Sequence, residues 1–294
     1  MHRDVMKPAF MTGTFFETNL FQHLDRIQEI GYDTLEIWCY EPHFYYQSQD
    51  HVQRVKKELD RRKLKVHSLH ATFHGLLDLS GLDDCDRIHA LETVKKQARI
   101  TSYLGAQIIV VHPGAKNVPR SERKIRIGYF LEALNQLIPV CKRLGLKIAV
   151  ENMGPDYLGD KIEEIARIVN SYEKDIVGIC LDTSHANLTG DLFNYLDRLG
   201  ERIITFHISD NNGVHDDHLP PGQGQINWPK FLKGVEKIGY KGPLVMEILD
   251  KESNDLYESI RTAKENLEYF LKFEQETNLP LLNFNKTKPS RQKR

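Results

Sequence analysis

Polar side chains that can bind a metal ion or move a proton end six successive apolar runs of the chain. These runs and the residues after them read SLHATF, VVHPG, VENMG, CLDTSHA, FHISD and VMEI. The candidate residues in them are His70, His112, Glu151, Asp182, His185, His207, Asp210 and Glu247. Buried imidazoles and carboxylates are costly unless they are paired or bind a metal, and mixed nitrogen and oxygen ligation suits Zn²⁺, Mn²⁺, Fe²⁺ or Co²⁺. One such histidine alone is more often a hydrogen-bonded core or rim residue, so the convergence of the set predicts metal binding.

A second group of candidate ligands lies in the segment NNGVHDDHLPPGQGQINW, which follows FHISD. Asp216 and His218 are two residues apart, and extended backbone would direct both side chains to the same side, as chelating ligands require. His215 and Asp217 would then face away. The alternative interpretation of this segment is a solvated polar loop.

The segments around these residues predict eight repeats of a strand followed by a helix, because short apolar runs alternate with longer segments of helical period. We expect strands at 8–15, 34–40, 65–73, 107–112, 147–153, 177–183, 204–210 and 244–248. We expect helices at 20–30, 49–62, 84–104, 121–144, 161–171, 191–199, 228–238 and 255–273. Eight such units favour an α/β fold that closes as a (β/α)8 TIM barrel in a single domain, over an open doubly wound sheet.

Four glycines mark the ends of predicted helices. Gly31, Gly105, Gly145 and Gly239 each follow an apolar helix end and precede a strand, and the left-handed position after a helix suits glycine. No GxGxxG or GxxxxGK motif follows a strand, which excludes the usual nucleotide-binding loops. In a parallel barrel the active site lies at the C-terminal ends of the strands, where the candidate residues would meet.

The composition is that of a soluble globular protein without a strong global charge. The 294 residues include 40 basic and 41 acidic side chains, with 40% hydrophobic and 28% charged residues. This balance gives no general attraction to nucleic acid or to an anionic membrane. No apolar stretch is long enough to span a membrane, and the first residues lack the apolar core of a signal peptide, so we expect a cytoplasmic protein.

The four cysteines are too sparse for a disulfide framework, and none forms a CxxC pair. We therefore expect buried free thiols at Cys39, Cys85, Cys141 and Cys180. No Pro/Ser/Gly-rich linker divides the chain. We expect the barrel to span residues 1–275 and the polar, basic segment 276–294 to be a disordered tail.

Taken together, VHPG, VENMG, CLDTSHA, FHISD, the HLPPG segment and MEI make the chain resemble the xylose-isomerase-like TIM barrel superfamily. This superfamily contains sugar phosphate isomerases and epimerases and the endonuclease IV type of abasic-site nucleases, also called AP endonuclease family 2. The resemblance covers nearly everything from the second predicted strand to Glu247.

The resemblance implies two sets of metal ligands. The single metal of the sugar epimerases and isomerases is held by two glutamates, an aspartate and a histidine, which fall here on Glu151, Asp182, His207 and Glu247. The three-metal nucleases use five further ligands, which fall by motif on His70, His112, His185, Asp216 and His218. All nine positions carry the matching residue type. We therefore expect one to three divalent ions, with Zn²⁺ or Mn²⁺ as the expected metals.

The hypothesis we favour is an isomerase or epimerase of a sugar or sugar phosphate, with a small-molecule substrate and no membrane partner. Glu151 and Glu247 would act as acid and base around a metal-stabilised enediolate, and His185 would orient a substrate oxygen. The loop segment LDLS after His70 also resembles the sugar-acting members. Self-association of the chain fits the family. Aromatic side chains expected either to wall the pocket or simply to pack are Trp38, Tyr40, Phe44, Phe73 and Trp228.

Other classes of function remain open from the sequence. One is an endonuclease IV-like phosphodiesterase in which three metal ions cleave DNA at abasic sites, and only this alternative makes nucleic acid a partner. Another is a metal-dependent sugar lyase. The last is a non-catalytic binding protein, whose thermal stability would not respond to Mn²⁺ or Zn²⁺.

Overall fold

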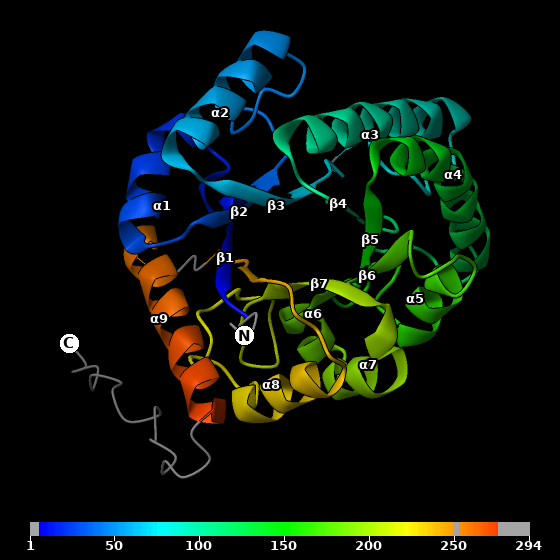
Figure 1. The fold of residues 1–294 in the computed structure, drawn as a ribbon. Helices are drawn as coiled ribbons and strands as arrows, with labels where there is room; N and C mark the ends of the chain where they lie inside the picture. The colour runs from blue at the N-terminus through cyan, green and yellow to red at the C-terminus, as the bar shows by residue number, and fades with distance from the viewer. Residues whose placement is uncertain (1–5, 74, 250–252, 254, 276–294) are drawn as a thin grey trace, which may run out of the picture.

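The computed structural model describes residues 6–73, 75–249, 253 and 255–275, and their strands form one closed barrel. All eight strands are parallel and follow one another around the barrel in chain order, with β8 closing against β1 (Figure 1). They are β1 (Pro8–Met11), β2 (Thr34–Trp38), β3 (Lys65–His70), β4 (Ile108–Val111), β5 (Lys147–Glu151), β6 (Val177–Asp182), β7 (Ile203–Ile208) and β8 (Leu244–Met246). The predicted single-domain (β/α)8 barrel is confirmed.

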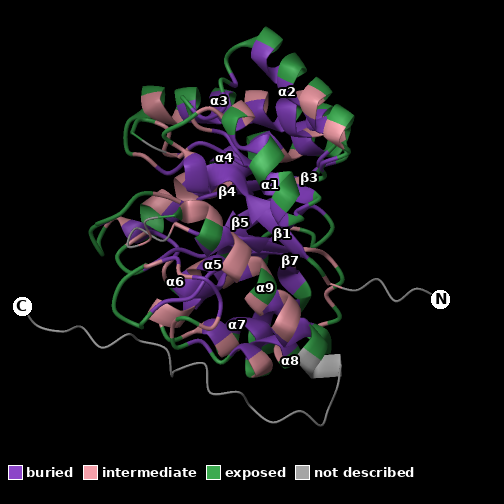
Figure 2. Cartoon of the chain, turned by 90° about the vertical axis from the view of Figure 1, so that its left-hand side faces the viewer, coloured by how far each residue is buried: buried purple, intermediate pink, exposed green. Residues whose placement is uncertain are grey.

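Helices surround the barrel and connect each strand to the next (Figure 1). They are α1 (Leu24–Ile30), α2 (Gln49–Arg62), α3 (Asp84–Leu104), α4 (Arg123–Leu144), α5 (Ile162–Val169), α6 (Thr183–Leu188), α7 (Leu192–Leu199), α8 (Trp228–Lys237) and α9 (Leu256–Gln275). Short 3₁₀ helices are η1 (Thr12–Phe15), η2 (Leu20–Gln22) and η3 (Gly200–Arg202). The exposed residues of the helices lie on their outward faces, whereas the strands that the helices cover are almost wholly buried (Figure 2).

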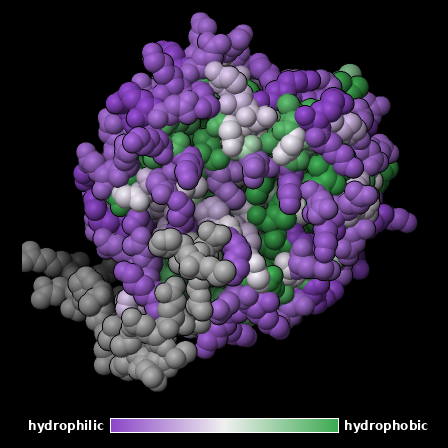
Figure 3. All heavy atoms as spheres, viewed as in Figure 1, coloured by the Kyte–Doolittle hydropathy of each residue, from purple (hydrophilic) through white to green (hydrophobic). Residues whose placement is uncertain are grey.

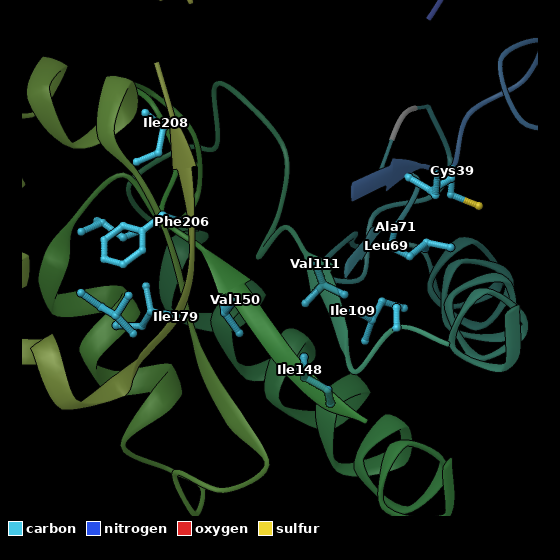
Figure 4. Close-up of a cluster of buried hydrophobic side chains, with 14 of the residues drawn as sticks. Cys39, Leu69, Ala71, Ile109, Val111, Ile148, Val150, Ile179, Phe206 and Ile208 are labelled. Atoms are coloured by element: carbon cyan, nitrogen blue, oxygen red, sulfur yellow. The ribbon is translucent and has the colours of Figure 1, made fainter. Parts of the chain in front are cut away.

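The main hydrophobic core fills the space between the barrel wall and the helices. Alternate residues of each strand point outwards into it, among them Leu69, Ile109, Val150, Ile179 and Phe206 (Figure 4). Burying each such side chain contributes about 1.5–3 kcal/mol to stability. The opposite face of the same strands points into the barrel, where a small apolar cluster lies beneath the polar residues of the strand ends: Ile108, Val110, Ala149 and Cys180. Because side chains alternate between the two faces of a strand, the polar residues at the strand ends lie on the face that points into the barrel.

The glycines predicted to end helices do so. Gly31, Gly105, Gly145 and Gly239 have φ angles of 97°, 89°, 68° and 73°, all in the left-handed region that favours glycine. Each then leads within a few residues into the following strand. These turns fix where each strand starts, and so where its polar C-terminal end emerges.

Strands β2, β3, β5, β7 and β8 end two or three residues earlier than expected, and two further differences bear on the site. The first strand ends at Met11 rather than at residue 15, because the chain turns into η1 where Gly13 passes over Trp38; a Cβ on Gly13 would lie 2.7 Å from the indole. The backbone after β6 forms helix α6 at once, because the Asp182 side chain accepts a hydrogen bond from His185 N at 2.7 Å. His185 therefore lies on the first turn of a helix.

Polar residues occupy most of the periphery of the face seen in Figure 3. Within the described residues, we find no helix with the length and apolar character of a membrane span. The thiols of Cys39, Cys141 and Cys180 are free and buried as expected, but Cys85 is exposed, because it lies at the start of α3. The predicted tail at 276–294 lies outside the described residues.

Candidate metal centre

The nine predicted ligands gather at one end of the barrel, around a cavity of about 550 Å³. The strand ends bring them there, since parallel pairing sets Asp182 of β6 beside His207 of β7 and aligns β5 with β6 just below. Asp182 and His207 are fully buried beneath the cavity. The ligands that line it are His70, His112, Glu151, His185, Asp216, His218 and Glu247.

The central group contains Glu151, Asp182, His207 and Glu247, each of which has one ligand atom within 4.8 Å of those of the other three. His207 Nδ1 lies 3.2 Å from Glu151 Oε1 and 2.9 Å from Glu247 Oε2. Three carboxylates thus face one imidazole in a buried site. This donor set suits a borderline divalent cation.

The charges of this group shift its pKa values. Burial would raise the pKa of Glu151, but the charge of His207 and the hydrogen bonds from His207 and His112 outweigh it and hold that pKa well below the usual range. Burial is likewise outweighed at Glu247, where the same His207 and then His218 bring the pKa to about 2. Asp182 differs, because burial and the Glu247 charge raise its pKa to about 7 against the opposing charge of His185.

Asp182 also has an oxygen without a hydrogen-bond partner in the described part of the chain. Its Oδ1 caps α6, whereas its Oδ2 is buried and makes no hydrogen bond. A buried carboxylate oxygen without a hydrogen-bond partner lowers the stability of the folded state. Because Asp182 belongs to the group with His207, Glu151 and Glu247, this oxygen without a partner fits a bound cation.

A second group joins His70 and His112 to Glu151. The Nε2 atoms of the two histidines lie 3.1 and 3.0 Å from the same oxygen, Glu151 Oε2, and 3.2 Å from each other. His70 Nδ1 donates to the carbonyl oxygen of Ala71 at 3.0 Å, which leaves Nε2 as the ring nitrogen that can offer a lone pair. Burial lowers the pKa of His112 to about 4, so its ring is neutral near pH 7.

A third group consists of His185, Asp216 and His218. Asp216 Oδ2 lies 3.2 Å from His185 Nε2 and 2.9 Å from His218 Nε2. Each imidazole uses its Nδ1 on a backbone carbonyl, that of Asn152 at 3.0 Å for His185 and that of Glu247 at 3.2 Å for His218. Burial opposes protonation of His218, but the charge of Asp216 outweighs it and raises the pKa of His218 to about 9.

The loop after β7 therefore supplies the ligand candidates Asp216 and His218. The extended backbone that was predicted to bring them together is wrong. His218 has a φ angle of 46°, so a turn rather than an extended segment brings its ring to Asp216. His215, which was expected to face away, lines the cavity. Asp217 is bonded within its own loop, where its Oδ2 accepts from Asn212 N at 3.3 Å.

Asp210 holds this loop in place and does not face the metal groups. Its carboxylate accepts hydrogen bonds from Gly222 N at 2.9 Å, Ile226 N at 3.1 Å and Trp228 Nε1 at 2.8 Å. The sequence placed it among the strand-end candidates. The structure assigns it to the buried framework that positions the Asp216 segment.

We expect Asp210→Ala to lower the free energy of unfolding by about 3 kcal/mol or more, since it leaves several buried N–H groups without an acceptor. Urea unfolding monitored by circular dichroism measures this change. Asp197→Ala is the matched control, because the Asp197 carboxylate pairs with Lys237 at 3.2 Å on the surface and should contribute no more than about 1 kcal/mol. Equal losses in the two variants would remove the framework role of Asp210.

The aromatic predictions are confirmed only in part. Trp38 and Phe73 line the cavity, and Tyr40 stacks on Trp38 with ring centroids 5.1 Å apart. Phe44 and Trp228 instead pack in the core between strands and helices and do not reach the cavity. Their fully buried side chains lie on the outward side of the barrel wall.

The rim of the cavity contains a feature that the sequence did not indicate. Lys116, in the loop after β4, forms an isolated antiparallel bridge with Tyr157, in the loop after β5, and its Nζ lies 5.5 Å from the Tyr157 ring centroid. Arg123 at the start of α4 donates to Tyr157 O at 2.9 Å and to Glu164 Oε1 at 2.7 Å. Both bridge residues line the cavity.

Glu36 of β2 is a second residue that sequence reasoning missed. It is fully buried, and its Oε1 lies 2.9 Å from His207 Nε2. Burial would raise the pKa of Glu36, but the His207 charge and hydrogen bond hold it below the usual value. The signal was a single charged residue inside the apolar strand TLEIW, at the alternation that faces the barrel interior.

Comparison with known proteins places the chain among barrels of the same kind. The family described as "Xylose isomerase-like TIM barrel" matches residues 24–273. An uncharacterized protein of Methanocaldococcus jannaschii is 29% identical over 276 residues, with 90% of each chain covered. The inosose isomerase of Bacillus velezensis is 26% identical over 283 residues, covering 91% of this chain and 99% of the relative. A crystal structure of a D-tagatose 3-epimerase-like protein superposes with a TM-score of 0.81 at 26% identity, covering 92% and 99% of the two chains.

Proposed function

Because the chain belongs to the xylose isomerase-like TIM barrel family, we propose that it is a divalent-metal-dependent isomerase or epimerase acting on a sugar or sugar phosphate. The observation that carries this proposal is the buried group of Glu151, Asp182, His207 and Glu247, whose ligand atoms lie within 4.8 Å of one another at the cavity floor. The similarity to an inosose isomerase and to a D-tagatose 3-epimerase-like protein supports a small polyhydroxy ketone as the substrate.

These four residues would hold one divalent ion, with Zn²⁺ or Mn²⁺ as the expected metal. When bound, it would supply Lewis-acid stabilisation of the negative charge that develops on adjacent substrate oxygens as an enediolate forms. Glu151 and Glu247 differ from the other two ligands, because they also line the cavity and so meet a bound substrate. Asp182 and His207 lie beneath them and would serve the metal alone.

The two glutamates would share the proton transfer. Since the pKa values of both carboxyl groups lie below the usual range, both start as carboxylates near pH 7. One of them would take the proton from the carbon next to the carbonyl group and become a carboxylic acid. In an isomerase this acid would return its proton to the neighbouring carbon, which moves the carbonyl group. In an epimerase the other glutamate would gain a proton from solvent and donate it to the opposite face of the same carbon, while the first glutamate loses its proton to solvent.

Other cavity residues would orient the sugar and exclude water. His185 lines the cavity and would bind a substrate oxygen beside Asp216, whose Oδ2 lies 3.2 Å from His185 Nε2. Trp38 and Phe73 offer apolar faces against which the C–H groups of a sugar ring can pack. A cavity of about 550 Å³ is large enough for a monosaccharide and its phosphate.

The test is a screen for carbon-bound proton exchange with solvent. Protein reconstituted with Zn²⁺ or Mn²⁺ is incubated in ²H₂O with ketoses, keto-polyols and their phosphates, and deuterium incorporation is followed by NMR. We expect incorporation next to the carbonyl group together with an epimer or isomer of the substrate. Well-folded, metal-loaded protein that exchanges none of these compounds would contradict the proposal.

A second candidate is a phosphodiesterase that uses three metal ions, and the three adjoining ligand groups favour it. Glu151 belongs both to the central group and to that of His70 and His112, and Asp216 joins His185 to His218. Incision of a duplex oligonucleotide at one abasic site by the metal-loaded protein, lost in Glu151→Gln, would establish this candidate instead. An endonuclease IV control verifies the substrate.

Asp216→Asn is expected to lower the bound metal per chain if ions occupy the His185–His218 group, because the variant loses the anionic oxygen between the two imidazoles. Inductively coupled plasma mass spectrometry after dialysis measures the stoichiometry. Asp217→Asn is the matched control, since the neighbouring carboxylate bonds within its own loop. Unchanged stoichiometry in Asp216→Asn would leave this segment as an ordinary polar loop.

A further inference from the structure

Glu36 is a buried carboxylate in the barrel interior, and the reaction proposed above does not use it. It lies on β2, on the opposite side of His207 from Glu151 and Glu247, and its side chain is fully buried. Its Oε2 accepts a hydrogen bond from Ser68 Oγ of β3 at 2.5 Å, and its Oε1 faces His207 Nε2 at 2.9 Å. Both oxygens of the carboxylate are therefore acceptors with a partner.

The contacts of His207 divide its two ring nitrogens between two tasks. Nδ1 faces Glu151 Oε1 at 3.2 Å and Glu247 Oε2 at 2.9 Å, within the central group. Nε2 faces Glu36 Oε1 at 2.9 Å. Because carboxylates can only accept, the metal-free ring donates from both nitrogens. A metal ion bound at Nδ1 would take the place of the proton there, and the N–H that remains is the one on Nε2 that Glu36 accepts.

Three of the other four histidines of the centre are oriented in a different way. The Nδ1 atoms of His70, His185 and His218 face backbone carbonyl oxygens at 3.0, 3.0 and 3.2 Å. The backbone thus leaves Nε2 of each ring for the ligand groups. His207 reverses this pattern, because it offers Nδ1 and uses a carboxylate side chain in place of a carbonyl.

Stability alone does not account for a carboxylate at this depth. Withdrawing a charge from water costs several kcal/mol, and a buried ion pair is often no more stable than well-packed apolar side chains of the same volume. A carboxylate behind a metal-bound histidine instead fixes the ring orientation and raises its basicity as a ligand. The geometry of Ser68, Glu36 and His207 matches that second use.

We infer that Glu36 is a positioning residue of the metal centre, which holds His207 in the Nε2–H tautomer and aims its Nδ1 lone pair at the ion. The inference rests on the metal site of the proposed function. Ser68 in turn fixes the Glu36 carboxylate, so that the orienting chain runs from β3 through β2 to β7. Glu36 is not among the residues that line the cavity.

The experiment measures the affinity of the metal itself, apart from any turnover. Zn²⁺ binding to wild type, Glu36→Gln and Glu236→Gln is titrated in competition with a chromophoric chelator. We expect Glu36→Gln to raise the dissociation constant about tenfold to hundredfold. Glu236→Gln is the matched control, because it makes the same change at an exposed position of α8, and its dissociation constant should equal that of wild type.

A spectroscopic readout separates positioning from a general structural effect. The visible absorption of Co²⁺-loaded protein depends on the geometry of its ligands, and we expect its bands to move in Glu36→Gln but not in Glu236→Gln. Cooperative thermal unfolding of the metal-free variants checks their fold. If Glu36→Gln does not fold, Glu36→Asp replaces it, since the shorter carboxylate keeps its charge but withdraws from Nε2 and should weaken binding equally.

The outcomes distinguish this inference from the function on which it rests. Wild type that binds no Zn²⁺ or Co²⁺ would overturn both. Wild type that binds tightly, together with a Glu36→Gln variant of equal affinity and unchanged Co²⁺ spectrum, would overturn the positioning role alone. Weaker binding with shifted bands in Glu36→Gln, and not in Glu236→Gln, supports it.

Discussion

Glu151→Gln and Glu247→Gln are each expected to lower the turnover number by about a thousandfold, whichever sugar proves to be the substrate. General acid–base catalysis by one side chain contributes roughly 10²- to 10⁴-fold, and an amide can neither take nor return the proton. Each glutamine also weakens the central metal group, to which both glutamates belong. The turnover number is measured at saturating substrate and at saturating metal, so that a lower metal affinity is not mistaken for lost proton transfer.

Glu236→Gln is the matched control for this prediction. Glu236 is exposed on α8, away from the cavity-lining residues, and the same change there should leave turnover at the wild-type value. Wild-type turnover in Glu151→Gln or in Glu247→Gln would remove that glutamate from the proposed mechanism. Loss of turnover in the control variant would point to damaged protein rather than chemistry.

Removing divalent ions should abolish turnover and lower the midpoint of thermal unfolding. An ion present at a hundred times its dissociation constant stabilises the native state by about 2.7 kcal/mol. For a chain of this size, each kcal/mol corresponds to roughly 2–4 °C, so we expect a shift of about 5 °C or more. Calorimetry before and after dialysis against a chelator, and again after adding Zn²⁺ or Mn²⁺, measures it.

Asp182→Asn provides the comparison for metal removal. Asp182 Oδ2 is a buried ligand atom without a hydrogen bond among the described residues, so the amide removes a ligand without opening the cavity. We expect the variant to fold and to lose most of the metal-dependent shift. Equal midpoints for wild-type protein with and without added metal would favour the non-catalytic class that the sequence left open.

The repeating strands and the convergence of the ligands could be predicted because both follow from periodic rules. Alternation within a strand places Glu151, Asp182, His207 and Glu247 on the inner face, and parallel closure brings their strand ends together. No side-chain contact needs to be known for this step. The helix-ending glycines were predictable for the same reason, since a left-handed residue is a local requirement.

Features that depend on contacts between distant segments could not be predicted in this way. The first strand stops early because Gly13 passes over Trp38, a contact between two different repeats. The ring of His215 reaches the cavity, and His218 reaches Asp216, through a turn whose shape is set by the buried carboxylate of Asp210. The role of Glu36 appears only when β2 and β7 are known to face each other across the barrel.

The bridge between Lys116 and Tyr157 has a consequence for how new substrate preferences can arise in this scaffold. Lys116 and Tyr157 lie on two loops that are tied together and anchored by Arg123, whereas the ligand groups begin at the strand ends. The conformation of each rim loop therefore depends on the other loop. A redesign that exchanges one loop alone would break the bridge between them. Exchanging both loops together with Arg123 would change the rim and leave the ligand groups at the strand ends as they are.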